Sequence, residues 1–195
     1  YLTSKKYNKI FLITGKKSYY ESEANKIFDE ILKDKTHFKY FKKEFIPKFE
    51  ELKAIILSVK EFSPDLILAI GGGTVIDYAK IANCLPYKTS KQEIVSGSLN
   101  LKKRADLCVI PTTAGSGAEV TENAVIYLDD IKYSVEHKLI KPGRCFLVPE
   151  FIIGSSKKLK ASSGFDAIAQ ALESIISVRS NEESLKFSTE SLKYS

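Results

Sequence analysis

Short apolar runs alternate with segments of helical spacing through most of the chain. The runs, which have the length and composition of buried strands, cover 9–14, 37–46, 66–70, 106–111 and 144–148. Apolar residues three or four positions apart predict helices over 19–34, over 48–62 and after residue 74. This alternation predicts an α/β fold with a parallel sheet that is covered by helices on both faces.

The remaining segments interrupt or end that alternation. Residues 86–104 are polar and predict an irregular loop, whereas 123–128 and 132–135 predict a hairpin on the rim of the sheet. From about residue 157 the pattern becomes wholly helical, and a further helix is expected over 181–195. We therefore expect two domains: an α/β domain over 1–155 and the beginning of a helical domain over 156–195.

Three consecutive glycines, Gly71, Gly72 and Gly73, directly follow the apolar run 66–70 and precede Thr74 and a helix. Glycine lets the backbone approach a ligand closely, and a helix N-terminus offers unpaired N–H groups to an anion. Thr74 can either cap the helix or bind a phosphate oxygen. Because the segment fits neither G-x-G-x-x-G nor Walker A, we expect a nucleotide site of another kind. The alternative is a tight turn that binds no ligand.

A second polar segment, 111–121, follows the strand expected over 106–111 and reads PTTAGSGAEVT. Its hydroxyls and glycines suit phosphate or ribose oxygens, although such a segment can also be a plain polar loop. Ligand sites in parallel sheets lie at the carboxyl ends of strands. Gly15, the glycine triplet and residues 111–113 all follow strands, so we expect them along one edge of the sheet.

Composition narrows the class of protein. The 195 residues are 44% hydrophobic and 28% charged, which is typical of a folded globular protein. No apolar run is long enough to span a bilayer. The net charge of +6 comes from dispersed lysines rather than from the dense stripe of a nucleic-acid-binding protein. Cys84 and Cys108 are expected as buried free thiols, which, with Cys145, suits a reducing cytoplasm.

Asp166, Gln170 and Glu173 share one face of the helix expected after residue 157. A carboxylate on that face could bind a metal or act as a general base. Alternatively, Asp166 belongs to the first turn of a helix capped by Ser162 or Ser163, where its charge would favour the helix dipole.

Together these segments resemble the iron-containing alcohol dehydrogenase family and, more distantly, glycerol dehydrogenase and dehydroquinate synthase. GGGTVIDYAK is similar to the family's Gly-Gly-Gly-Ser-x-x-Asp-x-Ala-Lys, and PTTAGSGAEVT to its Pro-Thr-Thr-Ala-Gly-Thr-Gly-Ser-Glu. SSGFDAIAQALES is similar to the helix that carries the first metal ligands. The resemblance covers nearly the whole chain.

The resemblance implies a dehydroquinate synthase-like fold, in which a Rossmann-like nucleotide domain precedes an all-helical metal domain. It also implies that catalysis takes place in the cleft between the two. Because family members are much longer, the resemblance also implies that this chain is a fragment, which we expect to bind nucleotide at best and not to turn over.

The resemblance also assigns roles to residues that match the family's motifs. The implied coenzyme-binding set is Gly15, Ser18, Gly71, Gly72, Gly73, Thr74, Asp77, Thr112, Thr113, Ser116 and Lys132. Within this set, residues 72–74 hold the pyrophosphate, the hydroxyls of residues 112–116 line the ribose region, and Lys132 contacts a ribose. Asp77 and Asp166 are the implied catalytic residues, with Asp77 near the nicotinamide and Asp166 as the first metal ligand.

The chain departs from the family pattern at the end of its first strand. Many members have an aspartate there, which binds the adenosine 2′-hydroxyl and excludes a 2′-phosphate. This chain has Gly15, followed by Lys16, Lys17 and Ser18. The loss of a carboxylate and the gain of cations and a hydroxyl favour a 2′-phosphate, so we expect NADP to be accepted, with NAD as the alternative.

A second departure concerns the metal. The family pattern Asp-x-x-x-His appears here with Gln170 in place of the histidine after Asp166. An amide oxygen is a poorer ligand than imidazole for Fe²⁺ or Zn²⁺, and the two histidines of the chain, His37 and His137, lie in no ligand motif. We expect a site formed by Asp166 and Gln170 to hold its metal weakly, to hold a different metal, or to hold none.

These features predict an NAD- or NADP-dependent, metal-dependent alcohol dehydrogenase-like enzyme that interconverts an alcohol and an aldehyde or ketone by hydride transfer. One alternative is a sugar- or phosphonate-modifying member, or a carbocycle synthase, of the same superfamily. Another is a nucleotide-binding homologue without metal activity, which Gln170 favours. Expected partners are a small-molecule alcohol or aldehyde and, in a homodimer, a second copy of the chain. Neither nucleic acid nor a membrane is expected.

Overall fold

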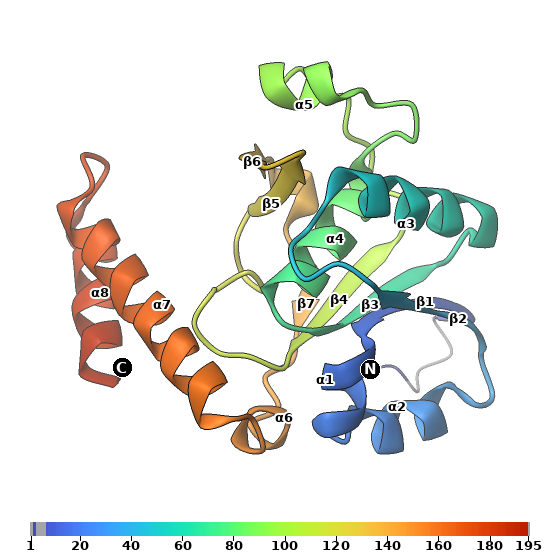
Figure 1. Ribbon diagram of the computed structural model, residues 1–195, viewed down its shortest axis with the longest axis horizontal. Helices are drawn as coiled ribbons and strands as arrows, with labels where there is room; N and C mark the ends of the chain where they lie inside the picture. The colour runs from blue at the N-terminus through green and yellow to red at the C-terminus, as the bar shows by residue number, and fades with distance from the viewer. Residues whose placement is uncertain (1, 3–6, 195) are drawn as a thin grey trace.

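The computed structural model describes residues 2 and 7–194. Its centre is a five-stranded, wholly parallel sheet in the order β2-β1-β3-β4-β7 (Figure 1). The strands are β1 (Lys9–Gly15), β2 (Thr36–Lys42), β3 (Leu66–Gly71), β4 (Asp106–Pro111) and β7 (Arg144–Cys145). The predicted α/β fold with a parallel sheet is confirmed.

Helices cover both faces of the sheet because its central strands are apolar on both sides. The four helices are α1 (Lys16–Glu21), α2 (Ala24–Leu32), α3 (Phe49–Phe62) and α4 (Gly73–Cys84). α3 and α4 lie on one face and α1 and α2 on the other (Figure 1). Alternate residues of β1 divide between the two cores: Phe11 and Ile13 pack with α3 and α4, and Ile10 and Leu12 with α1 and α2.

Two small elements lie outside the central sheet. β5 (Asn123–Leu128) and β6 (Ile131–Glu136) form the predicted hairpin, but as a separate antiparallel sheet in contact with α4. Helix α5 (Lys91–Ser96) interrupts the stretch predicted as an irregular loop. Ser90 and Glu93 form a capping box at its start, which stabilises this short helix.

The C-terminal part is helical, as predicted. A 3-10 helix, η1 (Lys138–Ile140), precedes β7, and α6 (Glu150–Ile153), α7 (Lys157–Ile176) and α8 (Glu182–Tyr194) follow it. α7 and α8 pack against each other (Figure 1). Ser195, the last residue of the helix predicted over 181–195, lies outside the described residues. The domain boundary at 155 stays a prediction.

Three predicted elements differ in extent from the structure. The helix predicted over 19–34 is divided into α1 and α2, because Glu23 adopts a left-handed φ of 60°. The strand predicted over 37–46 ends at Lys42, since the next amides bond to the carboxylate of Glu51 instead of to a strand. The strand predicted over 144–148 pairs with β4 only at its first two residues.

Cys84 and Cys108 are buried free thiols, as predicted, and Cys145 is a half-buried one. Burial raises the pKa of all three thiols. Within the part of the chain that the structure describes, no helix combines the length and apolar character that crossing a bilayer requires.

Candidate functional site

The carboxyl ends of the central strands meet at one edge of the sheet. Gly15 at the end of β1 pairs with Lys42 of β2, and Gly71 at the end of β3 pairs with Pro111 of β4. Gly15, the glycine triplet and the segment after Pro111 therefore line a common edge, as the sequence predicts.

The glycine triplet forms the turn from β3 into α4. Gly71 ends the strand, Gly72 is the N-cap and Gly73 begins the helix. A Cβ on Gly71 would lie 2.6 Å from Cγ2 of Val75, so the chain turns this tightly because residue 71 is glycine. Like the first amides of any helix, those of Gly73 and Thr74 have no acceptor within α4 and can bind an anion.

The loop over residues 112–117, called the nucleotide loop below, packs directly against the triplet. A Cβ on Gly72 would lie 3.0 Å from Oγ1 of Thr113, and one on Gly73 would lie 3.3 Å from Oγ of Ser116. Two hydroxyls predicted to bind the coenzyme therefore lie beside the turn predicted to bind its pyrophosphate.

Thr112 stands out in the nucleotide loop. Its amide donates to the carbonyl of Gly71 at 3.1 Å, which fixes it beside the triplet. The residue is 3% exposed, and among the described residues its Oγ1 has no hydrogen-bond partner. Leaving a buried hydroxyl unpaired costs about 1–3 kcal/mol. A polar ligand atom at this place would remove that cost.

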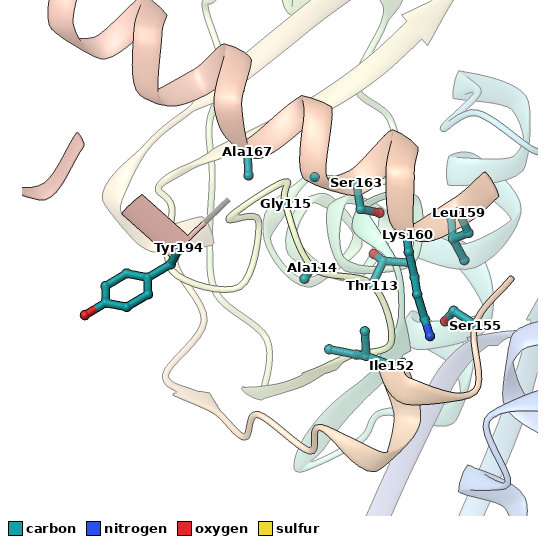
Figure 2. Close-up of a pocket in the computed structure, with 11 residues that line it drawn as sticks. Thr113, Ala114, Gly115, Ile152, Ser155, Leu159, Lys160, Ser163, Ala167 and Tyr194 are labelled. Carbon is teal, nitrogen blue, oxygen red and sulfur yellow. The ribbon is translucent and has the colours of Figure 1, made fainter. Parts of the chain in front are cut away.

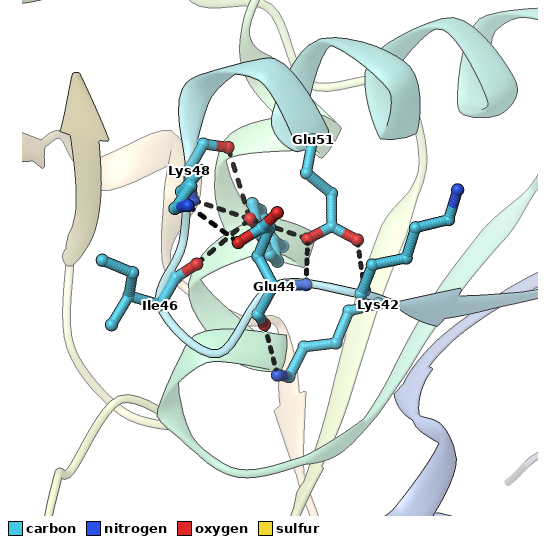
Figure 3. Close-up of polar contacts among 7 residues, drawn as sticks. Lys42, Glu44, Ile46, Lys48 and Glu51 are labelled. Carbon is cyan, nitrogen blue, oxygen red and sulfur yellow. Dashed lines mark hydrogen bonds and ion pairs between the residues drawn. The ribbon is translucent and has the colours of Figure 1, made fainter. Parts of the chain in front are cut away.

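Thr74 does not cap α4, although capping was one of the two roles expected of it. Its Oγ1 donates to the carbonyl of Phe45 at 3.1 Å, and Gly72 is the N-cap. The segment 43–48 is fixed in turn by Glu51, whose carboxylate accepts hydrogen bonds from the amide of Glu44 at 2.9 Å and from the hydroxyl of Tyr78 at 3.0 Å (Figure 3). α3 and α4 thus fasten this segment beside the triplet.

The other end of the edge carries the residues predicted to select the coenzyme. Oγ of Ser18 donates to the carbonyl of Gly15 at 3.1 Å. A Cβ on Gly15 would lie 2.9 Å from Oγ of Ser18 and 3.7 Å from Cε of Lys42. Ser18 and Lys42 therefore border the place where an aspartate side chain would start. Lys42 was not predicted as a site residue, because the strand was expected to run on to residue 46, whereas β2 ends at Lys42.

Asp77 combines deep burial with nearby cations. The residue is 8% exposed, and burial raises the pKa of its carboxyl to about 6. A hydrogen bond with the backbone of Val125 and the charges of Lys80 and Lys132 oppose that rise. The structure thus brings together Asp77 and Lys132, two residues of the predicted coenzyme-binding set. A buried group with a strongly shifted pKa is also typical of functional sites.

Lys80 fixes the hairpin to α4 and was also missed. It is fully buried, and burial lowers the pKa of its ammonium to about 8. The ammonium donates to the carbonyl of Asn123 at 2.7 Å and to Oγ1 of Thr121 at 2.9 Å. The position of Lys132, on the second strand of the hairpin, therefore depends on Lys80. A lysine three residues after Asp77, in a helix that is mostly apolar, was the available signal.

Asp166 lies in the middle of α7 and is exposed. The helix begins at Lys157, and Ser156 is its N-cap. The alternative that Asp166 belongs to a first turn capped by Ser162 or Ser163 is therefore wrong. Its role as the first metal ligand stays a prediction.

α7 contacts the nucleotide loop directly. Nε2 of Gln170 donates to the carbonyl of Gly115 at 3.0 Å. A Cβ on Gly115, whose φ is +125°, would lie 2.2 Å from the carbonyl oxygen of Ser163, so glycine permits this close approach. A cavity of about 240 Å³ lies between the loop and α7, and Figure 2 shows that its lining also includes Ile152 and Tyr194.

The residues that the structure describes do not make up a metal centre by themselves. Over residues 2 and 7–194, no group of three or more His, Cys, Asp or Glu side chains could hold a metal ion. The predicted pair offers one exposed carboxylate, from Asp166, and the amide of Gln170. That donor set does not fit Fe²⁺ or Zn²⁺, which take imidazole, thiolate or several carboxylate ligands.

Comparison with known proteins shows the family of this chain. The sequence profile of the family described as iron-containing alcohol dehydrogenase matches residues 1–149. The chain belongs to the iron-containing alcohol dehydrogenase family. A 4-hydroxybutyrate dehydrogenase of Clostridium kluyveri is 33% identical over 149 residues, which are 75% of this chain and 40% of the relative. An alcohol dehydrogenase of Thermococcus barophilus is 33% identical over 135 residues, 65% of this chain and 36% of the relative.

The chain spans less than half the length of these two family members. Among solved structures, an iron-containing alcohol dehydrogenase from Thermotoga maritima matches with a TM-score of 0.84 and 24% identity, over 94% of this chain and 52% of that chain. A sulfoacetaldehyde reductase from Bifidobacterium kashiwanohense, in complex with NAD⁺, matches with a TM-score of 0.75 and 23% identity, over 86% and 46% of the two chains. These likenesses establish the fold.

Proposed function

We propose that this chain forms the nucleotide-binding part of an NAD(P)-dependent oxidoreductase that interconverts an alcohol and an aldehyde or ketone by hydride transfer. The observation that carries the proposal is the packing of the glycine triplet against the nucleotide loop, beside the unpartnered buried hydroxyl of Thr112. Buried polar groups are normally hydrogen-bonded, and a turn that binds no ligand would leave this hydroxyl without a partner. Membership in the family supplies the class of reaction.

The residues that would hold the coenzyme differ in chemistry along the edge. The amides at the start of α4 suit the pyrophosphate, because a helix N-terminus stabilises negative charge. The hydroxyls of Thr112, Thr113 and Ser116 suit ribose oxygens, as does the ammonium of Lys132. Asp77 would face the nicotinamide end, where its carboxyl accepts a hydrogen bond when ionised and donates one when protonated. The nicotinamide, when bound, supplies the hydride acceptor or donor.

We further propose that NADP is accepted. Gly15 leaves the end of β1 without a carboxylate, and both Ser18 and Lys42 border that place. Lys16 and Lys17 are exposed in the first turn of α1. A 2′-phosphate forms stronger hydrogen bonds with such groups than a hydroxyl does, because the bonds are charge-assisted.

Iron enters this proposal as a property of the family. Asp166 would be the first ligand to Fe²⁺ or Zn²⁺, but the donors of the described residues do not fit such an ion by themselves. A second candidate function is a nucleotide-binding homologue without metal activity. The observation that favours it is the hydrogen bond from Gln170 to the nucleotide loop.

A small-molecule alcohol or aldehyde is the proposed substrate. The two relatives described above are named as a 4-hydroxybutyrate dehydrogenase and an alcohol dehydrogenase, which supports this class. For location we propose the cytoplasm, because a reducing compartment suits three free cysteines. Assembly into a homodimer stays a prediction.

Fluorescence titration with NADH and NADPH tests the coenzyme site. We expect saturable binding of both, with NADPH bound at least as tightly as NADH. If the wild-type chain binds neither coenzyme, the proposed function is wrong. If it binds NADH more tightly, the proposal about the 2′-phosphate is wrong.

Gly72→Ala locates the binding at the triplet. The new Cβ would lie 3.0 Å from Oγ1 of Thr113 and would narrow the turn. We expect affinity for either coenzyme to fall by roughly ten-fold, as for the loss of one charge-assisted hydrogen bond. Gly154→Ala is the matched control, because its Cβ would have no described heavy atom within 4 Å. That variant should bind like the wild type.

A further inference from the structure

Gln170 stands where the family pattern has a histidine, and its side chain is engaged with the nucleotide loop. Its Nε2 donates to the carbonyl of Gly115 at 3.0 Å. The reverse orientation of the amide would set its oxygen against the carbonyl oxygen, with an acceptor facing an acceptor. The chemistry therefore fixes the orientation, and Oε1 lies 4.0 Å from the place of a Cβ on Gly117.

The shape of the loop and the approach of α7 depend on each other. Gly115 and Gly117 have φ values of +125° and +63°, which favour glycine. The same loop conformation turns the Gly115 carbonyl toward Gln170 and brings Cα of Gly115 against the carbonyl of Ser163. The contact between the loop and α7 thus combines the side chain donor of Gln170 with the backbone conformation of Gly115 and Gly117.

We infer that Gln170 is a positioning residue, which fastens α7 to the nucleotide loop and thereby holds the loop's hydroxyls in place for the coenzyme. The consequence for the coenzyme rests on the proposed function, whereas the fastening itself does not. Ala171 is the one buried residue of α7, so little other packing holds the helix at this place. The cavity between the two elements is lined by Thr113 of the loop and by Ser163 and Ala167 of α7.

Two substitutions separate a hydrogen-bond donor from a metal ligand. Gln170→Glu keeps the size of the side chain and makes it a better ligand, but the ionised carboxylate cannot donate to Gly115. Gln170→Lys keeps a donor of similar reach, but an ammonium cannot bind a divalent cation. The two roles therefore predict opposite orders of these variants. Glu173→Ala, on the exposed face one turn further along, is the control.

Hydrogen–deuterium exchange of the peptide over 112–117, measured in EDTA without coenzyme, tests the fastening. We expect exchange to be roughly five-fold faster in Gln170→Glu, as for the loss of one hydrogen bond, and unchanged in Gln170→Lys and Glu173→Ala. The affinity for NADPH should be several-fold lower in Gln170→Glu than in the wild type, and close to that of the wild type in Gln170→Lys. Unchanged exchange in Gln170→Glu would overturn the inference.

Titration with Co²⁺, followed by its visible absorption, tests the ligand role. We expect the wild type and Gln170→Lys to respond alike. Stoichiometric Co²⁺ binding by the wild type that is lost in Gln170→Lys would make Gln170 a ligand and overturn the inference. If the wild-type chain binds neither NADH nor NADPH, the proposed function fails, yet the exchange experiment still decides whether Gln170 fastens the loop.

Discussion

Helices α4 and α7 each carry part of the predicted site, but they are buried to very different extents. Every residue of α4 from Val75 to Cys84 is buried, whereas α7 buries Ala171 alone among its residues, all of which the structure describes. α4 lies between the central sheet, α3 and the hairpin of β5 and β6, so none of its faces is left to solvent. α7 packs mainly on α8.

This difference decides how each helix can place a functional group. On α4, close packing fixes the surroundings of Asp77 and raises its pKa to about 6. On α7, the position of Gln170 depends on one hydrogen bond and one backbone contact with the nucleotide loop. Many packing contacts hold Asp77 in place, so no single one of them decides its position. The position of Gln170, in contrast, depends on Gly115 and on its own side chain.

Matched isoleucines test the contrast most strongly. Ile81 of α4 is fully buried, and Ile176 of α7 is 79% exposed. Ile81→Ala should lower the free energy of unfolding by about 3 kcal/mol, because it removes buried methylenes and leaves a cavity. Ile176→Ala should change it by less than about 0.5 kcal/mol. Urea unfolding measures both, and equal effects would contradict the contrast.

The pH dependence of Asp77 tests the packing of α4 next. A folded-state pKa of about 6, raised from 3.8, means that the folded state binds the proton more tightly than the unfolded state. The free energy of unfolding should therefore fall as the pH rises from about 4 to about 6, by roughly 2–3 kcal/mol. Asp77→Asn should lack this fall. Urea unfolding at several pH values measures this free energy in both proteins. If it changes with pH in the same way in both, burial does not raise the pKa of Asp77.

Gly115→Ala tests the contact that holds α7. Both the φ of +125° and the 2.2 Å approach to the Ser163 carbonyl oppose a Cβ there. We expect a loss of about 1–2 kcal/mol in unfolding free energy, with faster hydrogen exchange in the nucleotide loop. Gly164→Ala is the control: in mid-helix with open space around it, it should stabilise by about 0.5–1 kcal/mol. Destabilisation by both variants would point to a general sensitivity of α7.

Thr112→Val should have the smallest effect on stability and a clear effect on binding. Because Oγ1 is buried without a described partner, replacing it by a methyl group should change the unfolding free energy by less than about 1 kcal/mol, in the stabilising direction. Affinity for NADH should nevertheless fall several-fold. Thermal unfolding and fluorescence titration of one preparation measure both. A destabilised variant with unchanged affinity would make Thr112 a structural residue.

The fold could be predicted because its signals are local. β1, β3 and β4 are short apolar runs that end at glycine or proline, and the glycine triplet marks the turn at the end of β3. The break at Glu23 carries no such signal, since glutamate seldom adopts a left-handed φ. Helix α5 did carry one, the capping box of Ser90 and Glu93.

For the candidate site, the sequence alone predicted the common edge, because Gly15, the glycine triplet and residues 111–113 follow strand ends. Lys42 and Glu51 come close to the candidate site from β2 and α3, and these contacts become visible once the chain is folded. Helical periodicity also predicts one buried face for α4, whereas the hairpin covers the opposite face and buries Asp77 and Lys80 as well. The contact between Gln170 and Gly115 joins positions 55 residues apart.

The close approach of α7 to Gly115 limits which amino acids can stand at position 115. The atom of α7 nearest to a Cβ on Gly115 is a main-chain oxygen, that of Ser163. Any amino acid at 163 would present the same oxygen, so no change there can compensate for a side chain at 115. In a deep mutational scan, we therefore expect position 163 to tolerate most substitutions and position 115 to tolerate few. The two positions should show no covariation although they touch.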